Sequence, residues 1–91
     1  MKLEDIEEDV FRTIKGVARS KEPIIISPDV HLTNDLGLDS LDIAELHVSL
    51  EARHAHAGYN SDEVDVEKLM YAREIVNAVA EFYRKAGQLS S

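Results

Sequence analysis

The sequence predicts an all-α fold, a small four-helix bundle with three long helices, one short helix and a long first loop. Apolar residues recur at three- and four-residue steps in separate stretches, as one face of a helix requires. Hydrophobic residues make up 44% of the chain and aromatic residues only 5%, so the core must be largely aliphatic, which suits packed helices. The 91 residues contain no obvious interior linker, and we expect one domain over residues 1–87 with a tail over residues 88–91.

The first helix is predicted over residues 3–19. Acidic residues crowd its start, while Lys15 and Arg19 lie near its end, an order that complements the helix macrodipole. Its apolar stripe consists of Leu3, Ile6, Val10, Ile14 and Val17, with Phe11 widening it.

Residues 20–39 interrupt the helical pattern with Pro23, Pro28 and Gly37 and are predicted to form a long ordered loop. Ile24 to Ile26 would also suit a strand, but a single strand without a partner is improbable. The loop's own apolar residues are expected to hold it on the bundle: Ile24, Ile26, Leu32, Leu36 and Leu38.

A second helix is predicted from Leu41 to about Ala55, with Asp39 or Ser40 as its N-cap and Gly58 as its end. Residues 61–70 carry enough apolar residues for a short third helix. A last helix over residues 72–86 has the clearest amphipathic stripe, and Lys85 and Gly87 suit its C-terminal end.

The net charge of the chain limits the classes of partner that it is expected to bind. Ten Lys and Arg residues against eighteen Asp and Glu residues give a net charge of -8. This charge disfavours nucleic acids and anionic lipid surfaces and favours basic protein surfaces. The chain has no cysteine, no recognisable secretory leader and no apolar run long enough to cross a bilayer, so we expect a soluble, cytoplasmic protein.

Residues 35–42 read DLGLDSLD and place Ser40 among acidic residues. A serine at this place is commonly a helix N-cap. A hydrolase-type nucleophile would need G-x-S-x-G, and the second glycine is absent. A third interpretation is that the hydroxyl is modified, because a phosphodiester at a helix start meets unpaired backbone N–H groups and the positive dipole end. Since Asp39 and Asp42 repel a phosphate, this makes sense if another protein recognises them and attaches the group.

The motif, continued by Glu45 and Leu46, closely resembles the phosphopantetheine attachment motif of acyl carrier proteins, D-L-G-x-D-S-L-D followed by a Glu-Leu pair. The resemblance implies that Ser40 receives phosphopantetheine from coenzyme A through a phosphopantetheinyl transferase, the carrier-protein synthase, which uses magnesium. We also expect a monomer with no catalytic activity and no metal site of its own. Such a protein carries acyl groups as thioesters in fatty acid or related lipid synthesis.

The resemblance further implies a surface on the second helix for basic patches of acyl-transferring and acyl-modifying enzymes. Its expected residues are Asp39, Leu41, Asp42, Glu45 and Glu51. A carrier of long acyl chains must also shelter them between helices, although an ordinary packed core would explain the same residues. The candidate liners are Ala44, Val48, Leu50, Leu69, Ala72 and Ile75.

The end of the second helix departs from the family, because it is richer in histidine and less acidic. His54 falls where a buried apolar residue is anticipated, with Tyr59 as a replacement ring. His47, Glu51 and His54 share a helical face, but a metal site is disfavoured because no supporting groups are identifiable. Two alternatives to an acyl carrier stay open: a carrier of polyketide, aminoacyl or peptidyl cargo, and an unmodified helical adaptor in which Ser40 only caps the helix.

Overall fold

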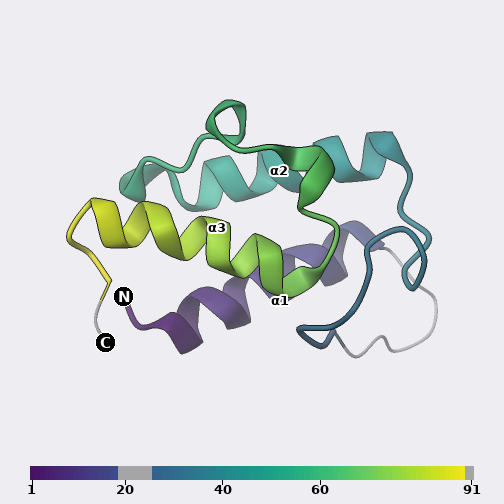
Figure 1. Cartoon of the computed structure of the whole chain (residues 1–91), viewed down its shortest axis with the longest axis horizontal. Coiled ribbons are helices and arrows are strands. Elements are labelled where there is room, and N and C mark those ends of the chain that lie inside the picture. The colour runs from purple at the N-terminus through teal and green to yellow at the C-terminus, as the bar shows by residue number, and fades with distance from the viewer. Residues whose placement is uncertain (19–25, 90–91) are drawn as a thin grey trace.

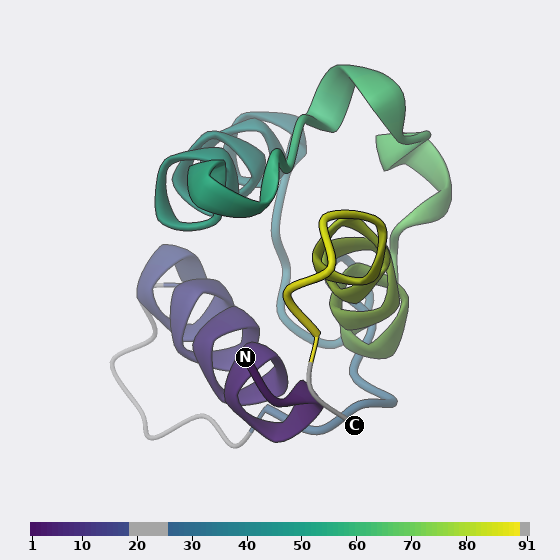
Figure 2. The same ribbon diagram turned by 90° about the vertical axis from the view of Figure 1, so that its left-hand side faces the viewer.

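The computed structural model describes residues 1–18 and 26–89, which form three α-helices: α1 (Leu3–Ala18), α2 (Ser40–Arg53) and α3 (Ala72–Lys85). Helix α1 runs in one direction along the molecule, and α2 and α3 both run in the other (Figure 1). Seen from the end, the three helices surround a common interior, and α1 packs against both of the others (Figure 2). The predicted all-α class is confirmed over the described residues, which contain no strand; His31 and Tyr71 form an isolated bridge.

Helix α1 buries the stripe expected from its spacing, with Ile6, Val10, Ile14 and Val17 in the core. Leu3 departs from the prediction and is 49% exposed, because it lies in the first turn at the end of the bundle. Arg19, the predicted last residue of this helix, lies outside the described residues.

The first loop is held on the bundle by its apolar residues and by its backbone. Leu32 and Leu38 are buried, as expected, and Ile26 and Leu36 pack against the core. The Leu32 N–H donates to the Met70 carbonyl at 2.8 Å, and the Ala72 N–H donates to the Val30 carbonyl at 3.0 Å. The loop is therefore fixed to the start of α3 just before α2 begins. Ile24 and Ile25, and with them the strand weighed above, lie outside the described residues.

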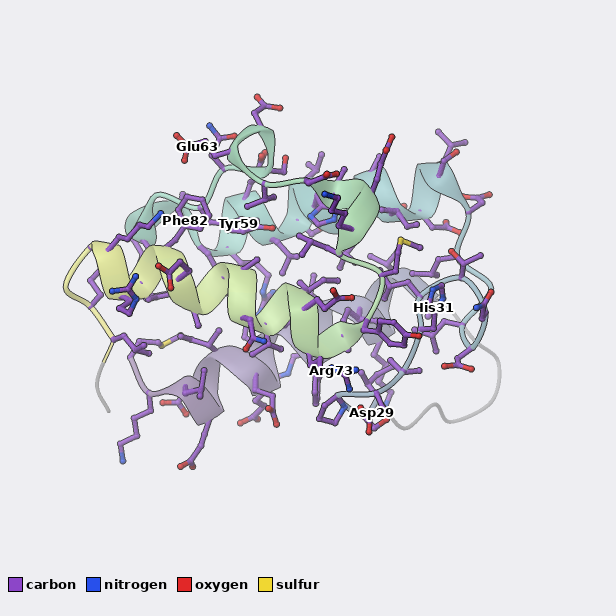
Figure 3. The ribbon with its side chains drawn as sticks, in the orientation of Figure 1. Asp29, His31, Tyr59, Glu63, Arg73 and Phe82 are labelled. Carbon is purple, nitrogen blue, oxygen red and sulfur yellow. The ribbon has the colours of Figure 1, made fainter. Side chains whose placement is uncertain are left out.

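Side chains add to this attachment (Figure 3). The Arg73 guanidinium pairs with the Asp29 carboxylate. The ring of His31 meets that of Tyr71 edge to face, with 5.0 Å between the ring centroids.

The predicted short helix over residues 61–70 is replaced by two separate 3-10 turns, η2 (Ser61–Glu63) and η3 (Val66–Lys68). The side chain of Asn60 accepts the Asp62 N–H, and the side chain of Asp65 accepts the Glu67 N–H. Val64, between the turns, has an extended backbone. The capping side chains and the β-branched valine favour short turns over a continuous α-helix.

Helix α2 ends earlier than Gly58, because Arg53 is its last residue and a third 3-10 turn, η1 (Ala55–Ala57), follows. Gly58 ends that turn, with a φ of 80° that suits glycine. Helix α3 has nearly its predicted bounds, and Gly87 follows it with a φ of 71°.

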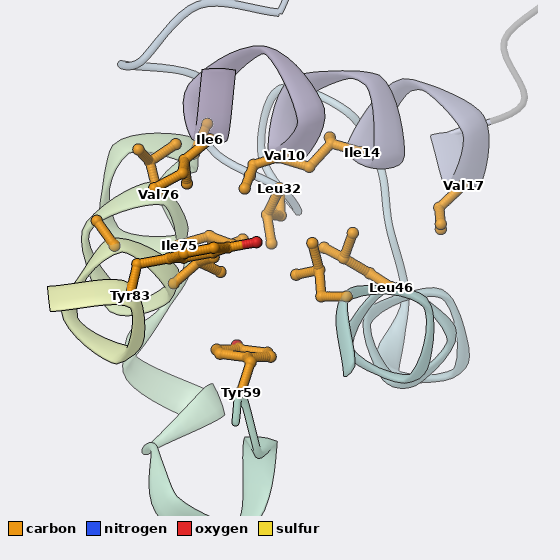
Figure 4. Packing of buried hydrophobic residues seen from close by; sticks show 14 of the residues in the cluster. Ile6, Val10, Ile14, Val17, Leu32, Leu46, Tyr59, Ile75, Val76 and Tyr83 are labelled. Atoms are coloured by element: carbon orange, nitrogen blue, oxygen red, sulfur yellow. The ribbon is translucent and has the colours of Figure 1, made fainter. Parts of the chain in front are cut away.

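The core is mainly aliphatic and is completed by two tyrosines (Figure 4). Tyr83 is fully buried and Tyr59 is 4% exposed. The ring of Tyr59 packs edge to face on Phe82, with 5.1 Å between the centroids. Tyr59 thus supplies a buried ring after α2, as the sequence suggested. The remaining buried apolar residues are Ile6, Val10, Ile14, Val17, Leu32, Leu38, Leu46, Leu50, Ala57, Ala72, Ile75, Val76, Val79 and Ala80.

A polar cluster joins the three helices at the end of α2 that is distant from Ser40. His54 is 1% exposed; its Nε2 lies 2.8 Å from the Asp9 carboxylate and its Nδ1 lies 2.7 Å from the Tyr83 hydroxyl. That hydroxyl is also 2.9 Å from Nε2 of His56. The Arg53 guanidinium bonds to Asp9, with Nε at 3.0 Å, and this pairing holds the pKa of the Asp9 carboxyl below its usual value. A buried histidine thus stands where an apolar residue was anticipated, with its Nδ1 bonded to the Tyr83 hydroxyl and its Nε2 close to the Asp9 carboxylate.

The end of the described chain returns to this cluster, where the Gln88 side chain donates to the His56 carbonyl at 2.9 Å.

Within the described residues, each helix is too short or too polar to serve as a membrane span.

Candidate functional site

Ser40 is the first residue of α2, and the residues before it set its position. Leu38 is 3% exposed and anchors the chain in the core. Asp39 then turns out in an extended conformation and caps the helix. Its carboxylate accepts the Asp42 N–H at 2.9 Å, and the Asp42 carboxylate accepts the Asp39 N–H at 3.1 Å. This reciprocal capping box satisfies donors at the helix start without the serine.

The Ser40 side chain is exposed, and its hydroxyl has no hydrogen-bond partner within the described part of the chain. Of the two N-cap candidates, Asp39 is the cap, so capping does not explain the serine. The adaptor alternative loses its supporting observation.

The surroundings of Ser40 suit a hydroxyl that receives a group. The two neighbouring carboxylates are occupied by the capping box. On α2 the next imidazole is that of His47, about 10 Å further along the helix axis. The positive end of a helix of 14 residues favours a phosphate attached at its first residue.

A groove with a volume of about 600 Å³ begins at Ser40 and lies between α2 and the segment that contains η2 and η3. Its wall is mostly apolar. The lining residues are Ser40, Ile43, Ala44, His47, Val48, Ser61, Val66, Glu67 and Met70.

Of the six predicted acyl-lining residues, Ala44 and Val48 line this groove. Leu50, Ala72 and Ile75 are fully buried in the packed core, and Leu69 packs against that core. The α2 residues that the prediction missed, Ile43 and His47, lie three and seven positions after Ser40. Helical spacing from the serine itself would have found them, because these positions share its face.

The predicted partner surface is partly brought together. Asp39 and Glu45 are exposed, Asp42 is half-buried, and Leu41 is 78% exposed beside them. The start of α2 therefore combines negative charge with an exposed apolar side chain.

Glu51 has a different environment, because its carboxylate accepts the backbone N–H of Ser61 at 2.7 Å and the Ser61 hydroxyl. These hydrogen bonds lower the pKa of the Glu51 carboxyl. Glu51 ties η2 to α2.

His47, Glu51 and His54 do not converge. The ring of His47 faces the Tyr59 hydroxyl at 3.4 Å, whereas His54 bonds to Asp9 and Tyr83. Among residues 1–18 and 26–89, no three carboxylate or imidazole groups are placed to hold a metal ion.

Comparison with known proteins decides the family. The family model described as "Phosphopantetheine attachment site" matches residues 8–70. The acyl carrier protein of Cyanidium caldarium is 31% identical over 78 residues, which cover 80% of this chain and 85% of the relative. This chain belongs to the acyl carrier protein family. The acyl carrier protein of Thermotoga maritima is 28% identical over 75 residues, covering 79% of this chain and 89% of that relative.

The family carries phosphopantetheine as a covalently attached group, which confirms the cofactor inferred from the motif. Its members act as carriers together with synthases and transferases. The geometry around Ser40 fits such a group, because an exposed hydroxyl stands at a positive helix end with an apolar groove beside it.

Proposed function

We propose that this carrier protein holds acyl intermediates as thioesters on a phosphopantetheine arm attached to Ser40, in fatty acid or related lipid synthesis. One observation carries the proposal: the Ser40 hydroxyl is exposed and unbonded within the described residues, while Asp39 performs the capping. Residues 1–87 form the carrier domain, and the protein acts as a cytoplasmic monomer.

Attachment requires a partner enzyme. The serine oxygen forms a bond to phosphorus as the diphosphate bond of coenzyme A breaks. The adenosine bisphosphate leaves, and the hydroxyl proton passes to a base on the transferase. Because Asp39 and Asp42 are occupied by the capping box, the transferase and its magnesium supply the catalysis.

When bound, the arm supplies a thiol, and the chain contributes none because it has no cysteine. The protein presents this thiol and catalyses nothing itself. Acyl-transferring and acyl-modifying enzymes form the thioester and alter the cargo.

Asp39, Asp42 and Glu45 attract basic patches on these enzymes, and Leu41 gives an apolar contact at the centre. Exposed charges add little affinity individually but raise association rates, which suits a carrier that meets many enzymes and leaves quickly. Glu51 lies further along the same helix and combines this role with holding Ser61.

The groove beside Ser40 is the proposed shelter for an acyl chain, with Ala44 and Val48 in its wall. Leu50, Leu69, Ala72 and Ile75 contribute only if the bundle opens toward its core. The choice between acyl and polyketide, aminoacyl or peptidyl cargo is made by the partners. Incubating the modified protein with candidate ligases, followed by mass spectrometry of the loaded protein, distinguishes these cargoes.

The test is incubation with coenzyme A and a promiscuous phosphopantetheinyl transferase. We expect one free thiol per chain and the matching mass increase. Ser40→Ala should gain neither, whereas Ser49→Ala, a serine change within the same helix, should be modified like the parent. Thiol in the Ser40→Ala variant, or none in the parent, refutes the proposal.

A further inference from the structure

One polar side chain in the groove wall is buried and incompletely bonded. His47 is 4% exposed, and its Nε2 atom has no hydrogen-bond partner among the described residues. Buried polar atoms are nearly always paired, and an unpaired one beside a groove is a place where a bound group can complete the bonding. The attachment motif does not include this residue.

The contacts of His47 assign the proton on its ring. Tyr59 is 4% exposed, and burial raises the pKa of its hydroxyl to about 12, so the hydroxyl keeps its proton. The only partner found for it within the described chain is Nδ1 of His47 at 3.4 Å. The hydroxyl therefore donates to Nδ1. Burial lowers the pKa of His47, and the neutral ring then carries its own proton on Nε2. The missing partner is an acceptor, such as a carbonyl oxygen.

Apart from Ser40 and His47, no described side chain that lines the groove offers a free hydrogen-bond donor. Ile43, Ala44, Val48, Val66 and Met70 present apolar surface. The Ser61 hydroxyl already donates to Glu51, and Glu67 is an exposed acid. An occupant that matches this wall is mostly apolar and carries a carbonyl oxygen at the depth of His47.

The length of the phosphopantetheine arm indicates which of its carbonyl groups can come level with His47. His47 lies about 10 Å from Ser40 along the axis of α2. An extended chain advances about 1.2 Å per bond, so the two amide carbonyls of phosphopantetheine reach about 7 Å and about 12 Å from the serine oxygen, and the thiol about 17 Å. The amide region lies level with His47, and a cargo on the thiol lies beyond it.

On the basis of the proposed attachment at Ser40, we propose that His47 binds the arm itself: its Nε2–H donates to an amide carbonyl oxygen when the arm lies in the groove. The unloaded arm then rests along α2, and a partner enzyme must draw it out of the groove before the enzyme can use the thiol.

Nuclear magnetic resonance of the imidazole nitrogens tests this without any substitution. Spectra are compared for the unmodified, the modified and the acylated protein. We expect the Nε2 signal of His47 to move on attachment of the arm, while His31, His54 and His56 serve as internal references. An unchanged His47 signal overturns the proposal. A signal that moves only with an oxoacyl cargo also overturns it, because His47 then binds cargo.

A second measurement uses the thiol. His47→Leu keeps an apolar wall but removes the donor, and should raise the rate of thiol alkylation about fivefold, the effect of one hydrogen bond. His56→Gln, in the polar cluster at the other end of α2, should leave the rate unchanged. Equal rates in the parent and His47→Leu contradict the proposal. A mass spectrum of the parent separates the two hypotheses: absence of the arm refutes attachment at Ser40, and an arm without these effects refutes only the role of His47.

Discussion

Tyr83→Phe tests whether the polar cluster under α2 stabilises the fold. The substitution keeps the aromatic ring, which meets the rings of His54 and His56 with centroids at 5.5 and 5.3 Å. It removes the hydroxyl that lies 2.7 Å from Nδ1 of His54. Because His54 is 1% exposed, this nitrogen loses its partner where water does not replace it.

Leaving a buried polar atom unpaired costs about 1–3 kcal/mol of unfolding free energy. Small domains have total stabilities of about 5–15 kcal/mol, so a loss of about 2 kcal/mol is large. With a denaturant slope of about 1–2 kcal/mol per molar urea for a chain of this size, the unfolding midpoint should fall by roughly 1–2 M.

Urea titration followed by circular dichroism measures this shift. Tyr71→Phe is the matched control, because Tyr71 is 38% exposed. Its unfolding free energy should change by less than about 0.5 kcal/mol. The double variant His54→Phe with Tyr83→Phe should recover part of the loss, because it removes both members of the buried pair. A Tyr83→Phe midpoint equal to that of the parent would refute the energetic role of the cluster.

Two further predictions follow from the same contacts. Burial lowers the folded-state pKa of His54 and of His47 below the ordinary 6.5, so the unfolded chain binds these protons first as pH falls. Their contribution to stability is therefore complete above about pH 6.5 and is lost below it. Urea midpoints of the parent at about pH 7.5 and about pH 5.5 measure this loss of stability, and His54→Phe should make the loss smaller. Equal parent midpoints at the two pH values would contradict the prediction. At the start of α2, Asp39→Ala should cost about 1 kcal/mol by removing the N-cap, whereas Asp39→Asn keeps the cap and removes the charge. Asp39→Asn should retain the urea midpoint but be modified more slowly by the transferase at low salt, and equal midpoints for the two variants would show that capping is unimportant.

The three long helices were predictable from sequence because their stripes are regular and their ends carry matching charges or caps. The 61–70 segment was not, because Val64 and Val66 suggest a helical stripe while Asn60 and Asp65 bond locally to the backbone. Apolar periodicity alone does not rank those local bonds against helix formation.

The site was predictable to the extent that it lies in one contiguous motif, which placed Ser40 at the start of a helix. The residues that line its groove were harder to predict, since Leu50 and Ile75 have the same apolar character as Ala44 and Val48 but are buried in the core. The roles of His47 and His54 depend on Tyr59 and Tyr83, which are distant in sequence, and only the tertiary structure brings these pairs together.

The main-chain bridge between the first loop and the start of α3 has a consequence for the variation this protein tolerates. The Leu32 and Ala72 amides donate to carbonyls of Met70 and Val30, so the pairing uses atoms that every residue except proline provides. Exposed side chains on this segment can thus diverge between species while the serine keeps its location, provided that Leu32 and Leu38 stay apolar.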